Sequence, residues 1–505
     1  MTSAIVIGAG SAGSVVARRL VDVGWDVTVL EAGGDDSNPA IYDPMRMGEL
    51  WHGPEDWNYY TVPQVHASGR RLHLPRGRVM GGSHALNAMI WVRCAPEDFD
   101  HWAALGNRGW SWNDVLPIYK EIEAFSGGES DLRGSHGLLP VTDDYELAPI
   151  QAAIIAAALE EGLEHNPDYN GSHMDGVSIQ QVTMRANRRE TTWTTYLKPV
   201  SDRVEIVTGA RVHSVVVKEG RAVGVRYVWQ GAEHTLAADE IILCAGALDS
   251  PTILLRSGIG PAEELSALGI DLVCDLPGVG RNLHDHLLSP VIFATKNKPV
   301  GPPVPGVSVT QTHLFWRSKP GLSAPDTQPI NFSVPMYGED LVPVGDDGFS
   351  LMAGIVSPKS RGSLTLSGPE LTDPVNIDLN ALAEPDDLDS LVASVRQCRS
   401  IGRRHPLVDE WGAEEVYPGP EVSDDALEEY VRRAAVTYHH QVGTCRMGND
   451  SESVVDERLR VHGVSGLRVM DASIMPRITT GNTNAPSVLI GEKGSRYVID
   501  DVVRG

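Results

Sequence analysis

The stretch that decides the fold is Ala4-Ile-Val-Ile-Gly-Ala-Gly-Ser-Ala-Gly13, near the start of the 505-residue chain. Residues 4–7 form a short apolar run rich in β-branched side chains, which predicts a buried strand. Residues 14–23 have helical character, and a second predicted strand, residues 26–30, ends at Glu31. This order of strand, glycine turn, helix, strand and acidic residue is typical of a Rossmann-like dinucleotide-binding unit.

Each glycine of the turn has a predicted role. Gly8 permits the tight turn, Gly10 lets the backbone approach a pyrophosphate, and Gly13 lets the helix pack closely against the strand. The helix N-terminus offers unpaired N–H groups to phosphate, and Glu31 is placed to accept hydrogen bonds from a ribose hydroxyl. The residues predicted to bind cofactor here are Gly8, Gly10, Ser11, Ala12, Gly13, Glu31 and Ala32. The unit alone does not choose between a nicotinamide and a flavin dinucleotide.

Composition narrows the class of protein further. A net charge of -25 disfavours nucleic acid as a partner, because an acidic surface repels phosphates. The N-terminus does not resemble a signal peptide, and no apolar run approaches the ~20 residues that span a bilayer. The five cysteines are scattered without CxxC spacing, which argues against a disulfide framework and a structural zinc site. We expect a soluble, cytoplasmic protein without membrane contact and without a metal.

Several further segments favour flavin. They read RGRVMGGSHALNAM (76–89), GALDSPTILLRSGIG (246–260), YHHQVGTCRMG (438–448), DASIMP (471–476) and GNTNAPSVLIGEK (481–493). Together they resemble signature stretches of the glucose–methanol–choline (GMC) family of FAD-dependent oxidoreductases, in particular its choline-dehydrogenase-like and alcohol-oxidase-like members. The resemblance runs from residue 4 to about residue 500 and is therefore specific.

The resemblance implies an α/β (α+β) architecture with two domains. A Rossmann-like FAD-binding domain would comprise residues 1–145, 195–290 and 430–505, and an inserted antiparallel-sheet substrate-binding domain would comprise residues 146–194 and 291–429. It also implies FAD as the cofactor. The further residues expected to bind FAD are Val79, Gly82, Asn87, Ala88, Met89, Val212, Asp471 and Thr483.

The C-terminal segment carries the predicted chemistry. Oxidation of an alcohol removes the hydroxyl proton and transfers a hydride to flavin N5, and a neutral imidazole is a suitable base near pH 7. Register against the family motif places the catalytic base at His440 and a second active-site residue at Asn482. The carboxamide of Asn482 would hold the substrate oxygen by a hydrogen bond without titrating.

Three positions depart from the family pattern: His439, Gln441, which replaces the common Pro, and His84. His439 stands where many members have a bulky aromatic residue, so it either lines the substrate pocket or replaces a packing ring; Tyr438 is a second pocket candidate. His84 replaces the usual Ser of the glycine signature. Members that attach FAD through a histidine carry it two residues later, where this chain has Leu86. We therefore predict non-covalent FAD, with a link to His84 as the alternative.

Substrate and acceptor follow less directly from the sequence. We expect a neutral primary alcohol of aryl or furanic type, with a sugar, glycoside or polyol as the alternative; choline is disfavoured, because an aromatic cage is not evident in a chain with 6% aromatic residues. O₂ is the expected acceptor, giving hydrogen peroxide, and a quinone-like or artificial acceptor is the alternative. The rival hypotheses are a nicotinamide-dependent dehydrogenase, a non-catalytic FAD-binding protein and a lyase on the flavin scaffold.

Overall fold

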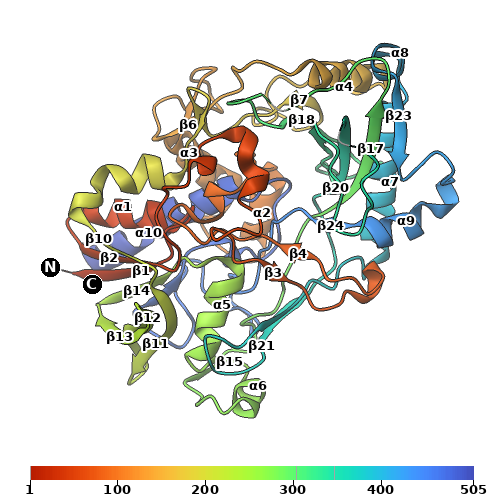
Figure 1. Ribbon diagram of the computed structural model, residues 1–505. Helices are drawn as coiled ribbons and strands as arrows, with labels where there is room; N and C mark the ends of the chain where they lie inside the picture. Colours follow the sequence, from red (N-terminus) through yellow and green to blue (C-terminus); the bar gives the residue numbers. More distant parts are fainter. Residues whose placement is uncertain (1, 303, 346, 505) are drawn as a thin grey trace.

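The structure, a computed structural model, describes residues 2–302, 304–345 and 347–504. Two large sheets organise it: a five-stranded parallel sheet and a seven-stranded antiparallel sheet on opposite sides of the molecule (Figure 1). The predicted α/β class, with a Rossmann-like unit and a separate sheet-rich part, is confirmed.

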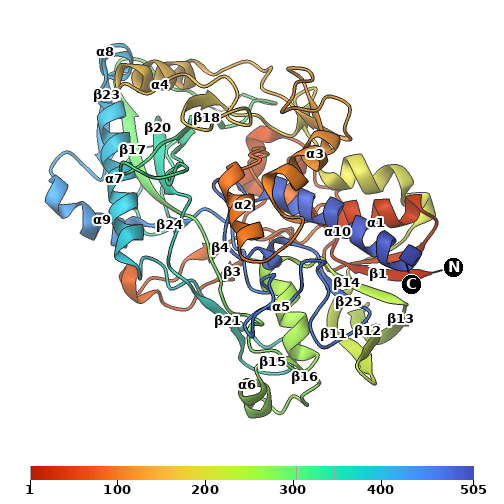
Figure 2. The same cartoon turned by 180° about the vertical axis from the view of Figure 1, so that it is seen from behind.

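The parallel sheet has the strand order β10-β2-β1-β14-β25. Its strands are β1 (Ser3–Ile7), β2 (Asp26–Glu31), β10 (Glu205–Thr208), β14 (Glu240–Leu243) and β25 (Leu467–Val469). The apolar residues of β1 are buried because both faces of the sheet are covered. Helices α1 (Gly13–Asp22) and α10 (Asn484–Arg504) cover one face (Figures 1 and 2). A small antiparallel sheet packs against the other side; its strands are β11 (Arg211–Lys218), β12 (Arg221–Trp229) and β13 (Ala232–Ala237). The predicted strands and helix agree with these bounds to within one residue.

The antiparallel sheet has the order β23-β17-β20-β19-β18-β7, with β24 also pairing with β17. Its strands are β7 (Gly176–Ile179), β17 (Leu287–Thr295), β18 (Thr310–Phe315), β19 (Ile330–Phe332), β20 (Gly348–Ile355), β23 (Ala413–Tyr417) and β24 (Val436–Thr437). Helix α7 (Pro385–Gly402) packs along β17 and β20. The approach is so close that a Cβ at Gly402 would lie 2.0 Å from the ring of Phe293, which leaves room only for glycine.

The seven-stranded sheet crosses the predicted domain boundaries at one place. β17 begins at Leu287, before the expected boundary at residue 290, and pairs with β24, which lies in the segment 430–505 assigned to the FAD-binding domain. Thr437 is opposite Leu287, so the strand that leads into His439 and His440 is part of the second sheet. The two-domain division otherwise stays a prediction.

The remaining elements surround these sheets. The helices are α2 (Pro96–Ala104), α3 (Trp112–Ile122), α4 (Pro149–Glu160), α5 (Gly246–Arg256), α6 (Ala262–Ala267), α8 (His405–Trp411) and α9 (Leu427–Ala434). Short strand pairs are β3 (Tyr59–Tyr60) with β4 (His73–Leu74), β5 (Glu123–Phe125) with β6 (Leu139–Val141), β8 (Met184–Arg185) with β9 (Arg188–Arg189), β15 (Ile259–Gly260) with β16 (Cys274–Asp275), and β21 (Ser363–Leu366) with β22 (Val375–Asp378). Within the described ranges, every helix is either too short or too polar to cross a bilayer.

Candidate active site

A cavity of about 450 Å³ lies where the two sheets face each other. That volume is within the range usual for cofactor and ligand pockets, roughly 300–1,000 Å³. The first glycine turn forms part of its wall, and Leu288, Ile330 and Phe332 of the antiparallel sheet form another part. His440 and Asn482 line the same cavity, so the structure brings the predicted catalytic pair to the predicted dinucleotide unit.

Gly13 and Gly10 of the glycine turn have different steric roles: one allows close packing, and the other leaves space for a ligand. A Cβ at Gly13 would lie 1.9 Å from the carbonyl oxygen of Gly8, so glycine is required by helix–strand packing. At Gly10 the nearest heavy atom to an added Cβ is Gly82 Cα at 3.8 Å, so the space beside it is open to a ligand. Ala12, the N-cap residue of α1, provides no side-chain cap, and Ser11 and Ala12 at this helix N-terminus line the cavity, where a phosphate would be favoured.

Glu31 lines the cavity and already accepts two backbone hydrogen bonds. Its Oε2 accepts from the N–H of Ala9 at 2.9 Å, and its Oε1 accepts from the N–H of Gly33 at 2.8 Å. Burial raises the pKa of the carboxyl to about 7. Each carboxylate oxygen retains a further lone pair, so a ribose hydroxyl can still donate to Glu31. Glu31 therefore also holds the glycine turn in shape, a role that the sequence did not indicate.

Asp471 lines the cavity near the start of α5. Its Oδ2 accepts hydrogen bonds from Gly246 N at 2.9 Å and from the Ser250 hydroxyl at 2.5 Å, and its Oδ1 accepts from Ser473 N at 2.8 Å. The carboxylate thus joins the N-terminus of α5 to the C-terminal segment. Burial raises the pKa of Asp471.

Most of the residues predicted to bind cofactor line this cavity. They are Gly8, Gly10, Ser11, Ala12, Glu31, Ala32, Gly82, Asn87, Ala88, Val212, Asp471 and Thr483. Gly13, Val79 and Met89 lie behind the wall instead. Val79 is buried in an apolar cluster with Ala40 and Leu50, and Met89 is buried in another with Val182. These side chains support the cavity wall by packing.

The predicted catalytic pair is in direct contact. Asn482 Nδ2 lies 3.2 Å from His440 Nε2, and Gln328, in the segment between β18 and β19, donates to Asn482 Oδ1 at 2.9 Å. The backbone N–H of His440 donates to Asp285 Oδ1 at 2.8 Å. Burial lowers the pKa of His440 well below its usual range, so its imidazole is neutral at pH 7. A neutral imidazole is the form that can accept a proton.

His286 is a functional candidate that sequence reasoning missed. It lies in the stretch NLHDH (282–286), just before β17. In the structure its Nδ1 is 3.0 Å from Nδ1 of His440, on the side of the ring opposite Asn482. Burial lowers the pKa of His286 to about 3, while the backbone of Val356 and Thr479 acts to raise it. No local pattern could reveal this contact, because the two histidines are 154 positions apart.

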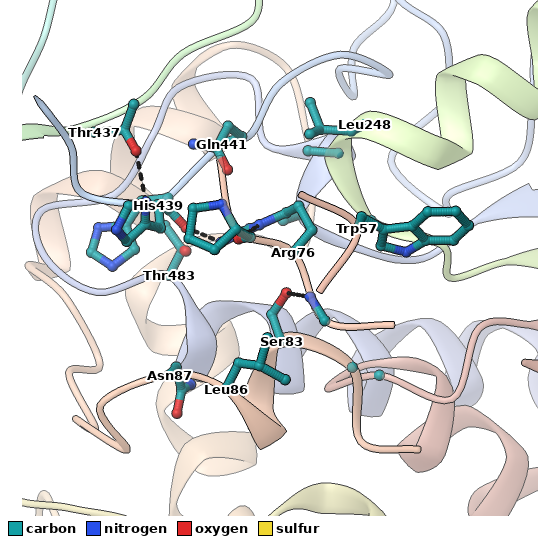
Figure 3. A pocket seen from close by; sticks show the side chains of 18 of the residues that line it. Trp57, Arg76, Ser83, Leu86, Asn87, Leu248, Thr437, His439, Gln441 and Thr483 are labelled. Carbon is teal, nitrogen blue, oxygen red and sulfur yellow. Dashed lines mark hydrogen bonds between the residues drawn. The ribbon is translucent and has the colours of Figure 1, made fainter. Parts of the chain in front are cut away.

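The two pocket candidates pack differently. Tyr438 stacks on the imidazole of His440, with 4.6 Å between ring centroids and 22° between planes. His439 has a positive φ of 66°, forms a hydrogen bond between its Nδ1 and the Thr437 hydroxyl at 2.7 Å, and lies edge-on to Trp51. Both line the cavity. In Figure 3, Thr437, His439 and Gln441 lie across the pocket from Ser83, Leu86 and Asn87.

His84, the alternative attachment point for FAD, is turned into the protein. Its Nε2 lies 3.0 Å from the Thr183 hydroxyl and 3.2 Å from Asn484 Nδ2, and its Nδ1 accepts from Thr192 N at 3.4 Å. Its side chain is fully buried and is not part of the cavity wall, whereas Leu86 is.

Comparison with known proteins agrees with this arrangement. Family models described as GMC oxidoreductase match residues 2–288 and 358–491. An "Alcohol dehydrogenase [acceptor]" of Pseudomonas putida is 35% identical, over 99% of this chain and 96% of its own length. An "Oxygen-dependent choline dehydrogenase" of Rhizobium etli is 37% identical, over 98% of this chain and 95% of its own. The crystal structure of pyridoxine 4-oxidase from "Mesorbium loti" superimposes with a TM-score of 0.93 at 34% identity and covers 99% of both chains.

The chain therefore belongs to the GMC oxidoreductase family. It is an FAD-dependent oxidoreductase that acts on CH–OH groups, and FAD is its cofactor. The open space beside Gly10, the uncapped N-terminus of α1 and the carboxylate of Glu31 suit the pyrophosphate and ribose of that cofactor.

Proposed function

We propose that this protein oxidises a primary alcohol of aryl or furanic type to the aldehyde, with His440 as the base and O₂ as the electron acceptor. The alcohol loses a proton and a hydride, and O₂ takes up two electrons and two protons to give hydrogen peroxide. FAD, when bound, supplies the hydride acceptor. The observation that carries the proposal is the contact between His440 and Asn482 at the wall of the cavity.

His440 and Asn482 have different roles at the hydroxyl group of the substrate. His440 Nε2 accepts the hydroxyl proton, which makes departure of the hydride easier; a positioned base of this kind typically contributes roughly 10²–10⁴-fold in rate. Asn482 donates a hydrogen bond to the substrate oxygen through Nδ2, because its Oδ1 is occupied by Gln328. Tyr438, stacked on the imidazole, restricts rotation of the His440 ring.

The apolar part of the wall supports the proposed type of alcohol. Leu288, Ile330, Phe332 and Met352 of the antiparallel sheet line the cavity that contains His440. These side chains offer no hydrogen-bond partner to the many hydroxyl groups of a sugar, and leaving such groups unpaired would cost binding energy. A relative that is 34% identical is named pyridoxine 4-oxidase, and pyridoxine is an aromatic alcohol.

Separate observations support O₂ as the electron acceptor and non-covalent binding of FAD. O₂ as acceptor is supported by relatives named pyridoxine 4-oxidase and oxygen-dependent choline dehydrogenase. Non-covalent FAD is supported by His84, because both of its ring nitrogens have partners within the protein. After acid precipitation of the holoenzyme, the yellow colour should remain in the supernatant.

The deciding experiment is an anaerobic stopped-flow titration of the holoenzyme with a panel of alcohols. We expect aryl or furanic primary alcohols to bleach the flavin fastest, and His440→Ala to retain FAD but reduce it at least ~100-fold more slowly. Aerobic turnover should release one hydrogen peroxide per aldehyde. Near-normal flavin reduction in His440→Ala would refute the base assignment, and faster bleaching by sugars would refute the substrate class.

A further inference from the structure

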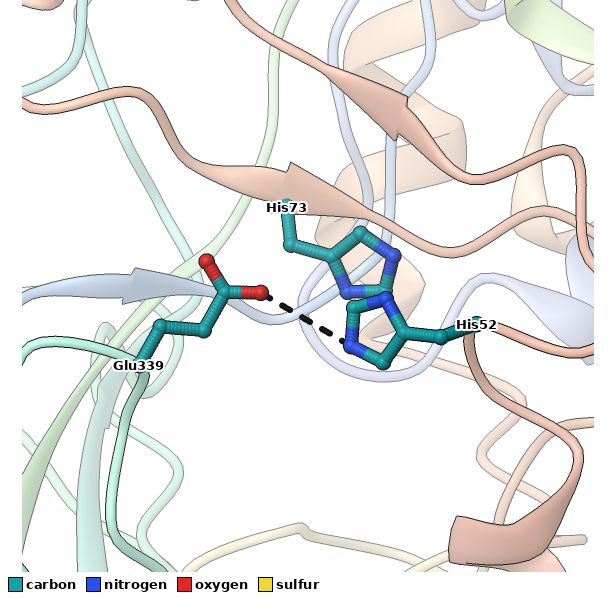
Figure 4. Close-up of side chains that lie close together, drawn as sticks. All are labelled: His52, His73 and Glu339. Atoms are coloured by element: carbon teal, nitrogen blue, oxygen red, sulfur yellow. Dashed lines mark ion pairs between the residues drawn. The ribbon is translucent and has the colours of Figure 1, made fainter.

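A second group of titratable side chains lies at the rim of the cavity. His52 follows the short helix at residues 44–49, His73 lies on β4, and Glu339 lies on the loop between β19 and β20, so the group joins the two sides of the cavity (Figure 4). One donor atom from each residue lies within 4.8 Å of the others. We propose that His52, His73 and Glu339 bind one divalent transition-metal ion of the zinc type.

Each histidine has a polar neighbour beside the ring nitrogen that does not face the group. His52 Nδ1 lies 2.8 Å from Asn58 Oδ1, an acceptor, so the proton is on Nδ1 and Nε2 carries the lone pair directed toward Glu339. His73 Nε2 lies 3.4 Å from Asp56 Oδ2, which leaves Nδ1 for a metal. Metal-binding histidines usually donate their second N–H to a carboxylate or carbonyl oxygen, and the ring of His52 follows that pattern.

The carboxylate of Glu339 is also oriented from outside the group. The Tyr60 hydroxyl donates to Glu339 Oε1 at 2.9 Å, and Tyr60 lies opposite His73 in the β3–β4 pair. Glu339 Oε1 lies 3.7 Å from His52 Nε2, which is too long for a hydrogen bond. In a tetrahedral zinc centre with bonds of about 2.0–2.1 Å the donors are roughly 3.4 Å apart, so the separation of His52 Nε2 and Glu339 Oε1 is already close to that spacing.

The exposure of the three side chains suits an open metal site. The side chain of His73 is 10% exposed and fixed by packing, whereas those of His52 and Glu339 are 49% and 47% exposed. The two imidazoles stack at 4.0 Å, so His52 must turn to bring its lone pair in line with that of His73, and its exposure allows this. Two histidines and one glutamate with a water as the fourth ligand form a known zinc coordination type.

A metal here would change access to the active site. Asp340, the neighbour of Glu339, already pairs with Arg70 at 2.6 Å across the same rim. A metal would add a further and shorter link to this ion pair and the Tyr60–Glu339 hydrogen bond, between His73 of β4 and Glu339 of the loop, which both line the cavity. We therefore expect bound metal to hold the rim closed and to slow the passage of substrate and product.

The test is isothermal titration of the FAD-loaded enzyme, freed of metal with a chelator, with ZnCl₂. We expect one zinc per chain, with binding at least ~10-fold weaker in His52→Ala and in Glu339→Gln. His405→Ala is the matched control, since it removes an exposed histidine paired with Glu160 at 2.9 Å away from the cavity and should bind zinc like the unaltered protein. Flavin absorbance checks that each variant is folded.

Each outcome supports or overturns either the metal site or its effect on access to the cavity. Absence of stoichiometric zinc binding, or equal affinity in all four proteins, would overturn the site. In parallel, zinc should lower kcat/KM for the best alcohol in the unaltered enzyme and have little effect in His52→Ala. Tight binding at this site without any change in kcat/KM would keep the metal site and overturn its role at the rim. Zinc binding is measured without turnover, so these results do not depend on the proposed function.

Discussion

His286→Leu is the substitution that most directly tests the proposed base. For His440 Nε2 to accept the substrate proton, Nδ1 must carry a hydrogen and must donate it. The acceptor is Nδ1 of His286 at 3.0 Å. For His286 Nδ1 to accept this hydrogen bond, the proton of the neutral His286 ring must be on Nε2. Leucine has a similar volume but no acceptor, so it would leave the buried N–H of His440 unpaired.

The expected effect follows from the contact that is lost. When His440 takes up the proton it becomes a cation, and a hydrogen bond to a charged group is worth roughly 1.5–3 kcal/mol. Since each 1.36 kcal/mol added to the activation free energy slows a reaction tenfold, flavin reduction should slow by about 10–150-fold. KM should change little, because His286 lies behind His440 and is not part of the cavity wall.

The assay is anaerobic stopped-flow reduction of the holoenzyme, with two comparison variants. Tyr438→Phe keeps the ring that stacks on His440 and loses only a hydroxyl whose contact with Gln328 O is 3.4 Å, so it should reduce flavin at nearly the normal rate. His286→Asn restores an acceptor and should recover part of the loss. Reduction in His286→Leu within threefold of normal, with FAD bound, would refute the argument.

Three other perturbations have definite expected results. Gly10→Ala should leave the melting temperature of the apoprotein unchanged and weaken FAD binding about tenfold or more by fluorescence titration, since its methyl enters the open space beside Gly82. Gly13→Ala should destabilise the apoprotein itself by about 3 kcal/mol or more in urea unfolding, because its Cβ overlaps Gly8 O at 1.9 Å; a stable, FAD-binding variant would contradict this. Burial lowers the pKa of His313 to about 3, whereas the unfolded residue takes up a proton below about pH 6.5, so the folded state loses stability as pH falls. Between pH 7.5 and 5.5 one such histidine lowers the free energy of unfolding by about 1.4 kcal/mol, so in urea unfolding His313→Gln should lose about 1.4 kcal/mol less than the unaltered protein. The same pH dependence in both proteins would exclude this contribution of His313.

The sequence determined the parts of the molecule that depend on neighbouring residues. Gly8 and Gly13 are needed because atoms a few positions away in the chain, or in the adjacent strand, leave no room for a Cβ. Such local steric demands leave a pattern that one sequence displays. His440 and Asn482 could be located for a related reason, since each lies in a short signature stretch with a fixed register. Val79 and Met89 belong to the same kind of stretch, yet position alone did not reveal that their side chains pack behind the wall.

Only the tertiary structure decided which distant residues meet. His286 contacts His440 because β17 and β24 pair, and Gln328 contacts Asn482 from the segment that precedes β19. The rim group of His52, His73 and Glu339 has the same origin, as a loop of one sheet lies against the β3–β4 pair. Contacts between positions more than 100 residues apart result from the packing of whole sheets, which is the sum of many weak interactions, so no short stretch of sequence contains them.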